Sequence, residues 1–373
     1  MSLNNISPGK VAIIIGENGS GKSTRLNLLS REYLSEDKDV IAIANSIHDK
    51  FRSKSKRFKL LGHRSGRKIS LKIVKKAFQN ISNEDLLKTK RIGRILDYVG
   101  YSPEVGFRVE FIKDIRKNGL REYDFFSNRE KNEILMLLNK LYHHDISGTH
   151  WVSLADFSFD KINSSTVTRL LRFEKTLKEL GAISEVDILL KKNGQVIDLM
   201  DASSGELSFI TSLIFISTSI TNQTVILIDE PENSLHPKWQ KEYITMIMDI
   251  FYYYEPIIIC ATHSPIIVSG AESSEGNSLY LYRSNSKGVE RSILESGNLE
   301  QILWEVFGVA TPENRFFSQL IMSRLNALAE NRATLNEVEV FLENIIEAAY
   351  DEKQKIMLST AINLARKIET RKS

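Results

Sequence analysis

Short apolar runs alternate along the chain with longer segments whose apolar positions repeat at helical spacing. Continuous β-branched runs predict buried strands at residues 11–15, 40–44, 224–228 and 257–261. Amphipathic periodicity predicts helices at residues 23–34, 69–79, 83–99, 129–141, 165–180, 205–220, 237–252, 335–348 and 352–368. Strands separated by helices are typical of a largely parallel sheet, so we expect an α/β fold.

The same pattern suggests how the chain is divided. Residues 186–191 and 195–199 flank Lys192-Asn193-Gly194, which predicts a β-hairpin arm. We expect a core formed by residues 1–82 and 184–297, a mainly helical insertion at 83–183, and a helical C-terminal extension at 298–373. The last two predicted helices indicate a helical hairpin within that extension.

A phosphate-binding loop follows the first predicted strand. The matching residues are Gly16, Glu17, Asn18, Gly19, Ser20, Gly21, Lys22 and Ser23, in the pattern G-x-x-x-x-G-K-S, followed by Thr24. Backbone N–H groups of such a loop, with the N-terminus of the next helix, surround phosphates. We expect Lys22 to reach the β- and γ-phosphates of ATP and the Ser23 hydroxyl to bind Mg²⁺. A glycine-rich turn without a ligand is a poor alternative, because strand, loop and helix occur in the required order.

Two adjacent acids end the buried strand at 224–228. Asp229 and Glu230 then lie at the carboxyl end of a strand, where ligands bind in open α/β sheets. We expect Asp229 to hold Mg²⁺ through water and Glu230 to orient or deprotonate the attacking water. Solvation of a strand end is the alternative interpretation.

Further motifs resemble those of ABC-type ATPases, in the family's order. Ala202-Ser203-Ser204-Gly205-Glu206 is similar to the signature motif, Ser234-Leu235-His236-Pro237 to the D-loop, and Thr262-His263-Ser264 to the switch histidine. The resemblance implies a RecA-like P-loop core. It also implies that Ser203, Ser204 and Gly205 close on the γ-phosphate held by the opposite subunit of a head-to-tail dimer, and that His263 contacts that phosphate within its own subunit. A histidine taken singly is as often part of a core.

Longer segments narrow the resemblance. Residues 229–240 and 261–265 are similar to the RecF-, SMC- and OLD-like branch rather than to transporter subunits. Residues 44–51 and 61–67 resemble PtuA-type ATPases of the Septu and retron anti-phage systems. This resemblance implies a sensor or regulatory ATPase with a separate effector nuclease of the HNH type. No nuclease motif follows His263, since the remaining sequence contains one aspartate, Asp351, and no histidine.

Charge is distributed unevenly along a chain whose net charge is only +3. Residues 50–94 contain 16 Lys or Arg against the two acids Glu84 and Asp85, and the remainder is acidic. We favour nucleic acid as the counter-charge, with Arg52, Lys54, Lys56 and Arg57 on its phosphates. An acidic patch on a partner protein and a solvated helical face are the alternatives.

Other features limit the function classes. The one cysteine, Cys260, excludes an internal disulfide and lies in a predicted strand, which fits a reducing cytoplasm. No apolar stretch approaches membrane-spanning length and the N-terminus lacks a signal-peptide core, so we expect no membrane partner. His143-His144-Asp145 with His150 could be a metal site, but we favour a solvated loop.

Together these observations predict an ATPase that hydrolyses ATP with Mg²⁺ as a homodimer or higher homo-oligomer. The alternatives are a RecF/SMC-like DNA-repair ATPase, a transporter's nucleotide-binding subunit, and an ATP-binding scaffold with little turnover.

Overall fold

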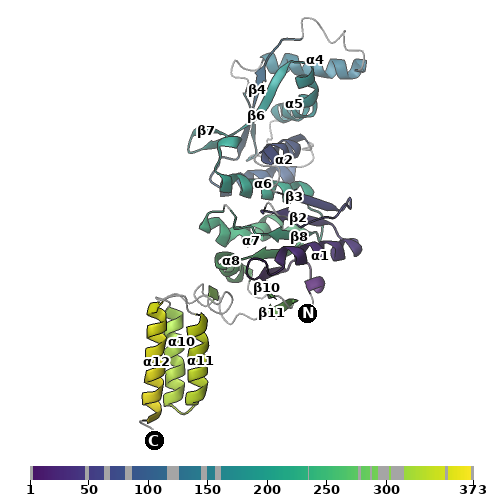
Figure 1. The fold of residues 1–373 in the computed structure, drawn as a ribbon. Coiled ribbons are helices and arrows are strands. Elements are labelled where there is room, and N and C mark those ends of the chain that lie inside the picture. The colour runs from purple at the N-terminus through teal and green to yellow at the C-terminus, as the bar shows by residue number, and fades with distance from the viewer. Residues whose placement is uncertain are drawn as a thin grey trace.

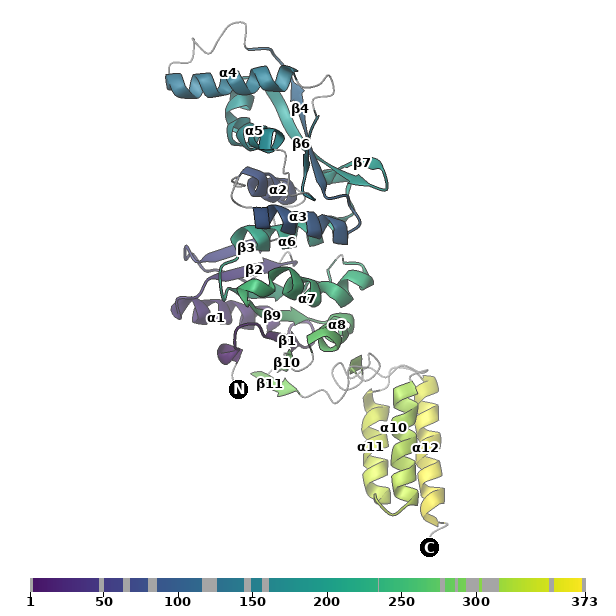
Figure 2. The same cartoon turned by 180° about the vertical axis from the view of Figure 1, so that it is seen from behind.

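The computed structural model describes residues 3–46, 50–62, 68–79, 86–115, 126–143, 149–155, 161–233, 235–275, 279–285, 288–292, 302–303, 315–348 and 352–370. Figure 1 shows a large sheet in the middle of the molecule, a smaller sheet with helices at one end, and a helical bundle at the other. Figure 2 shows the same arrangement from behind.

The large sheet has seven strands in the order β11-β10-β1-β9-β8-β2-β3. Their bounds are β1 Val11–Ile15, β2 Val40–Ala44, β3 Phe58–Gly62, β8 Val225–Asp229, β9 Ile257–Thr262, β10 Leu279–Asn285 and β11 Gly288–Ser292. Only β11 pairs antiparallel. The carboxyl ends of β1, β8 and β9 therefore meet at one edge, where Ile15 is opposite Thr262 and Asp229 opposite Ala261.

Both faces of this sheet are covered by helices. Successive side chains of a strand point to opposite faces, so each strand contributes apolar side chains to both layers. Ala12 and Ile14 of β1 pack with Leu26, Leu29 and Tyr33 of α1. The other face carries a larger apolar cluster that includes residues of α6, α7 and α8. These helices span α1 Lys22–Ser35, α6 Ser204–Ser219, α7 Pro237–Phe251 and α8 Pro265–Glu275. Helices α2 (Lys68–Gln79) and α3 (Leu86–Tyr98) pack on α6.

The smaller sheet is antiparallel, in the order β5-β4-β6-β7. Its strands are β4 Glu104–Phe111, β5 Thr149–Ser153, β6 Ile183–Lys192 and β7 Gln195–Asp198, accompanied by α4 Asn128–His143 and α5 Lys161–Glu179. The predicted hairpin is confirmed, with Lys192 opposite Gln195. The sequence pattern did not predict β4 and β5, whose partners lie far away in the chain. The interpretation of His150 as a loop residue was wrong, because it lies buried in β5.

The C-terminal helices form a bundle with its own apolar core. Helices α10 (Arg315–Ala329), α11 (Leu335–Ala348) and α12 (Glu352–Thr370) pack on one another. The predicted helical hairpin of the last two is confirmed, and α10 adds a third helix. No described helix of the chain has the length and apolar character needed to cross a membrane. The predicted α/β class, with a hairpin and C-terminal helices, is confirmed.

One close approach of helices fixes the position of α8, which begins just after the predicted switch histidine. A Cβ atom built on Gly270 of α8 would lie 1.8 Å from the carbonyl oxygen of Lys241 in α7. Only glycine fits there without moving one of the two helices.

We therefore expect Gly270→Ala to lower the free energy of unfolding by about 1–3 kcal/mol, the usual cost of overpacking. Urea unfolding followed by circular dichroism measures this. Ser273→Ala, on an exposed position of the same helix, is the control and should change the value by less than about 0.5 kcal/mol. Equal midpoints for Gly270→Ala and the parent would contradict the packing described.

Candidate functional site

The phosphate loop joins β1 to α1, as the motif requires. Gly19 and Gly21 have φ angles of +86° and +91°, which side chains with a Cβ atom rarely adopt. Gly16 is required by space, because a Cβ atom there would lie 2.6 Å from Ser20 Oγ and 2.7 Å from the Ser284 carbonyl oxygen. The loop can therefore turn tightly and present backbone N–H groups to phosphates.

Lys22, the first residue of α1, is 4% exposed. Its ammonium donates to the carbonyl oxygens of Gly16 at 2.8 Å and Glu17 at 3.1 Å. It also lies 3.3 Å from Oε1 of Glu230. A buried ammonium needs such compensation. The predicted phosphate-binding lysine and the predicted catalytic carboxylate are thus in direct contact.

The predicted magnesium ligands also meet. The Ser23 hydroxyl donates to Oδ1 of Asp229 at 3.1 Å, across 206 positions of sequence. Asp229 is fully buried at the end of β8. A hydroxyl oxygen and a carboxylate oxygen are ligands that Mg²⁺ prefers, and few protein ligands are usual where the substrate's phosphates supply others. The residues present therefore fit Mg²⁺.

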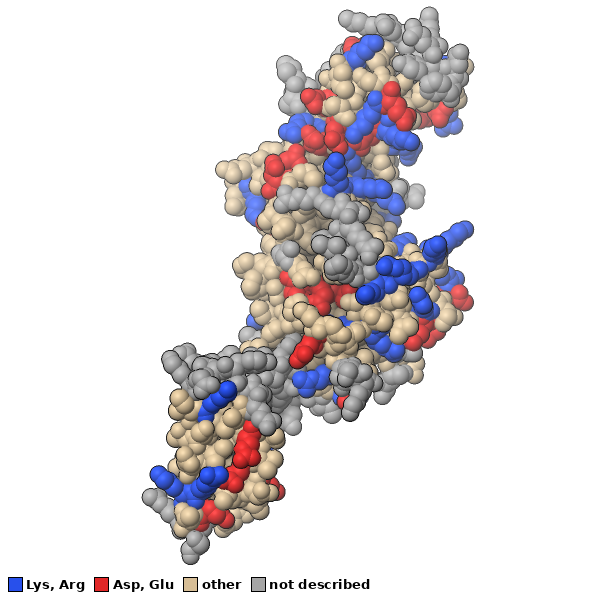
Figure 3. Space-filling view, viewed as in Figure 1, with Lys and Arg blue, Asp and Glu red and all other residues tan. Residues whose placement is uncertain are grey.

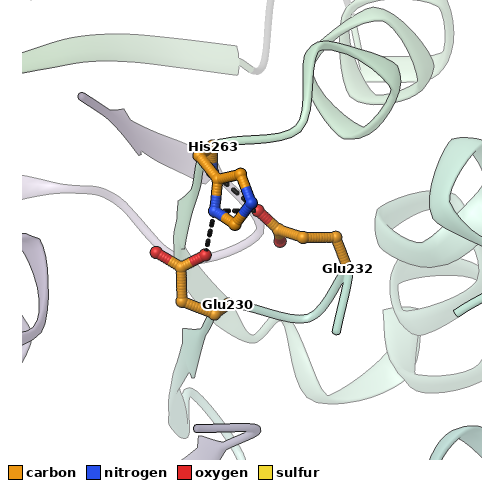
Figure 4. A group of neighbouring side chains, drawn as sticks. All are labelled: Glu230, Glu232 and His263. Atoms are coloured by element: carbon orange, nitrogen blue, oxygen red, sulfur yellow. Dashed lines mark hydrogen bonds and ion pairs between the residues drawn. The ribbon is translucent and has the colours of Figure 1, made fainter. Parts of the chain in front are cut away.

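Glu230 lies directly after β8 in a strained conformation, with φ of +53°. Its Oε1 faces Lys22, while its Oε2 contacts Nδ1 of His263 (Figure 4). Non-glycine residues in this region are uncommon and cluster at functional sites. In this conformation one carboxylate contacts both the phosphate-loop lysine and the histidine after β9.

Glu232 is a site residue that the sequence analysis missed. Its buried Oε1 accepts hydrogen bonds from the Thr262 hydroxyl at 2.7 Å and from the backbone N–H of His263 at 2.6 Å. His263 Nδ1 lies 3.0 Å from the same oxygen. Burial raises the pKa of Glu232. Its partners Thr262 and His263 lie at the end of β9 and directly after it, 30 and 31 positions away, so no local pattern could have identified Glu232.

The D-loop and the histidine loop are connected as well. The Ser264 hydroxyl donates to Gln240 Oε1 at 2.7 Å, and Gln240 Nε2 donates to the Leu235 carbonyl oxygen at 3.0 Å. Ser234 lies outside the described residues. Residues 47–49 and 63–67, which belong to the segments resembling defence ATPases, lie outside them too, as do His144 and Asp145.

The signature residues begin α6. Ser203 caps this helix in a capping box, in which its hydroxyl accepts from the Glu206 N–H at 3.3 Å and Glu206 Oε2 accepts from the Ser203 N–H at 3.1 Å. A hollow of about 750 Å³ lies beside the helix start, lined by Tyr98, Val99, Gly100, Ser203, Ser204, Gly205, Leu235, His236, Lys238 and Trp239. The signature and the D-loop therefore share one surface.

Glu206 also ties the signature to the smaller sheet. Lys192, at the end of β6, forms an ion pair with it, and the Tyr101 hydroxyl donates to its Oε2 at 3.0 Å. Burial acts to raise the pKa of Glu206, but the hydrogen bonds from Lys192, Ser203 and Tyr101 outweigh it and lower the pKa. The carboxylate is thus held ionised.

The predicted site residues form two groups within one chain. The phosphate loop, Asp229, Glu230 and His263 meet at the carboxyl edge of the large sheet. Thr24 lies exposed in the first turn of α1. Among the described residues, no hydrogen bond or ion pair joins 203–205 to the phosphate loop. Within the described part of the chain, the signature residues and the phosphate loop therefore belong to separate hydrogen-bond networks.

The chain is similar to several known proteins. It is similar to an ATP-binding cassette of an ABC transporter in its ADP conformation, at 13% identity and a TM-score of 0.31 over 81% of this chain and 87% of the cassette. It is also similar to a dimeric bacterial ABC transporter cassette, at 16% identity and a TM-score of 0.28 over 77% of this chain and 86% of the cassette. No curated protein matches. A family model described as "AAA domain, putative AbiEii toxin, Type IV TA system" matches residues 28–269, more than half of the chain. The chain belongs to this family of P-loop ATPases.

Proposed function

We propose that the protein hydrolyses ATP to ADP and phosphate, with Mg²⁺, in a head-to-tail homodimer. The observation that carries the proposal is the contact between Lys22 and Glu230, which joins the phosphate loop to the carboxylate expected to act on water. Membership of a P-loop ATPase family supports the same reaction.

The residues have distinct roles in the proposed reaction. Lys22 and the N–H groups of residues 16–24 hold the phosphates of ATP. Ser23 and Asp229 would hold Mg²⁺, which neutralises charge developing on the phosphate oxygens. Glu230 orients the attacking water and accepts its proton. His263 is placed to contact the γ-phosphate, while Glu232 keeps the histidine loop in position through Thr262 and the His263 N–H.

The dimer is proposed because Ser203, Ser204 and Gly205, which the resemblance assigns to the γ-phosphate, share no hydrogen bond or ion pair with the phosphate loop among the described residues. In a head-to-tail pair, Ser203, Ser204 and Gly205 would present a hydroxyl and the N-terminus of α6 to the γ-phosphate held by the opposite subunit. ATP would then close the dimer, and hydrolysis would open it.

We further propose that the opening and closing regulates a bacterial defence complex. The family's description names a putative toxin of a toxin–antitoxin system, and the resemblance to PtuA-type ATPases suggests a separate HNH-type effector nuclease. Nucleic acid is the proposed partner of this complex, through the basic residues 50–94. The transporter alternative gains no support from the described residues.

Glu230→Gln should leave ATP binding intact and lower turnover at least ~100-fold, because the amide keeps the shape but cannot accept the water's proton. Lys22→Ala should instead weaken ATP binding itself. A steady-state phosphate-release assay and titration with a fluorescent ATP analogue separate the two. Glu290→Gln, at an exposed position of β11, is the control. Unchanged turnover in Glu230→Gln would remove its assigned role.

Glu232→Ala should lower kcat about 10-fold or more, since His263 loses the acceptor that holds its loop, with a smaller change in KM. Glu232→Gln keeps an oxygen for Thr262 and His263 and should recover most of the rate. If the two variants are equally impaired, the negative charge rather than the hydrogen bonds matters.

Mixing Ser204→Arg subunits with Lys22→Ala subunits tests the shared site. Each variant alone should be inactive, because every composite site contains one defect. A heterodimer regains one intact site, so ATPase activity should return on mixing. Heterodimers that form, as shown by pull-down of differently tagged subunits, but remain inactive would rule out sites shared between subunits.

A further inference from the structure

We infer that three lysines of α2 bind the phosphate backbone of nucleic acid. The inference rests on the nucleic-acid partner proposed above and names its site. Lys68, Lys72 and Lys76 recur at intervals of four residues and are all exposed. With a rise of 1.5 Å per residue, this lysine stripe runs about 12 Å along one face of the helix. The opposite face, with Ile73, Val74 and Ala77, is buried in the core.

The acids around the lysine stripe already have other partners. Glu174 Oε1 forms ion pairs with the ammonium groups of buried Lys75 at 2.6 Å and of Lys178 at 3.4 Å. Asp187 Oδ2 forms an ion pair with Arg108 Nη2 at 2.7 Å. Within the ranges that the structure describes, none of the three stripe lysines forms an ion pair. Their charges are therefore available to an external anion.

The lysine stripe separates two hollows. One, of about 530 Å³, is lined by all three stripe lysines and by α5, and the other, of about 500 Å³, by Lys72, Lys76 and residues of β3 and α6. Lys59 lines the second hollow and donates to the Ser219 carbonyl oxygen at 3.3 Å. Figure 3 shows Lys and Arg gathered over the region where α2 and β3 lie.

Regular point charges beside open hollows suit a phosphate backbone better than an acidic protein. Phosphates repeat along a strand and are bound by lysine without a fixed fork geometry. A protein partner is usually anchored by aromatic or aliphatic side chains in a pocket. The first hollow is lined mostly by charged side chains, five lysines against the acids Glu174, Glu185 and Asp187, whereas the second hollow is lined by both lysines and apolar side chains.

The structure favours the lysine stripe over the loop before β3, which the sequence analysis preferred. Arg57 there lies 3.0 Å from Asp37 Oδ1, and Arg52 Nη1 donates to the Phe51 carbonyl oxygen at 2.9 Å. Part of the loop's charge is thus engaged. In contrast, the stripe lies on α2, which packs directly on α6, and the last turns of α6 line the second hollow through Phe215, Thr218 and Ser219.

The test is fluorescence anisotropy of a labelled 24-mer as DNA duplex, single-stranded DNA and RNA, without nucleotide, at several salt concentrations. Neutralising the stripe by Lys68→Gln, Lys72→Gln and Lys76→Gln should weaken binding about 100-fold at 0.1 M salt. The slope of log affinity against log salt should flatten by about 0.7–0.9 for each lost contact. Glutamine preserves helix propensity.

The matched control removes three charges from the loop, by Arg52→Gln, Lys54→Gln and Lys56→Gln, and should weaken binding much less. Equal loss in both triple variants, or parent-like affinity in the stripe variant, overturns the assignment. A parent chain that binds polyglutamate but no nucleic acid identifies an acidic protein instead and overturns it too. If circular dichroism shows that the triple variant of the stripe is misfolded, the slope of log affinity against log salt is measured for the three single variants instead. ATP binding of each variant, titrated separately, shows whether the nucleotide site is intact.

Discussion

The buried ammonium of Lys22 is the constraint on which the rest of the site depends. It lies at the carboxyl edge of the sheet, where it needs negative partners within hydrogen-bond distance. Two carbonyl oxygens of its own loop and the Glu230 carboxylate supply them. A phosphate offers the ammonium a stronger partner, so ATP would compete with Glu230 for Lys22. Release of Glu230 toward water would then follow from the arrival of the substrate.

The second half of the proposed site is connected to the outer parts of the molecule. Glu206 completes the capping box of the signature helix and contacts Lys192 and Tyr101, which connect it to the antiparallel sheet. The same helix supports α2 on its flank. A shift of α6 on closing over the opposite subunit's γ-phosphate would therefore reach both the hairpin and the lysine stripe. We propose this helix as the element that converts nucleotide state into a signal.

The sequence predicted those features that depend on local pattern. Buried apolar runs such as Val11–Ile15 predicted the positions of the parallel strands, and the motif at 16–23 predicted the position of the phosphate loop. Features set by distant partners were missed. Paired residues of β4 and β5 lie 41 to 49 positions apart, and β10 pairs with β1 from the other end of the core. Nothing in the local sequence distinguishes Glu232 from other acids, because its partners Thr262 and His263 meet it only in the folded chain.

In the proposed function, ATP joins two chains head to tail around composite sites. The only cysteine, Cys260, is buried, so Val196→Cys on the exposed face of β7 introduces a single accessible attachment point for a spin label. Double electron–electron resonance of the labelled Glu230→Gln protein should show one narrow intermolecular distance with Mg²⁺ and ATP, and none with ADP. No intermolecular distance at ATP concentrations that saturate binding would contradict the account.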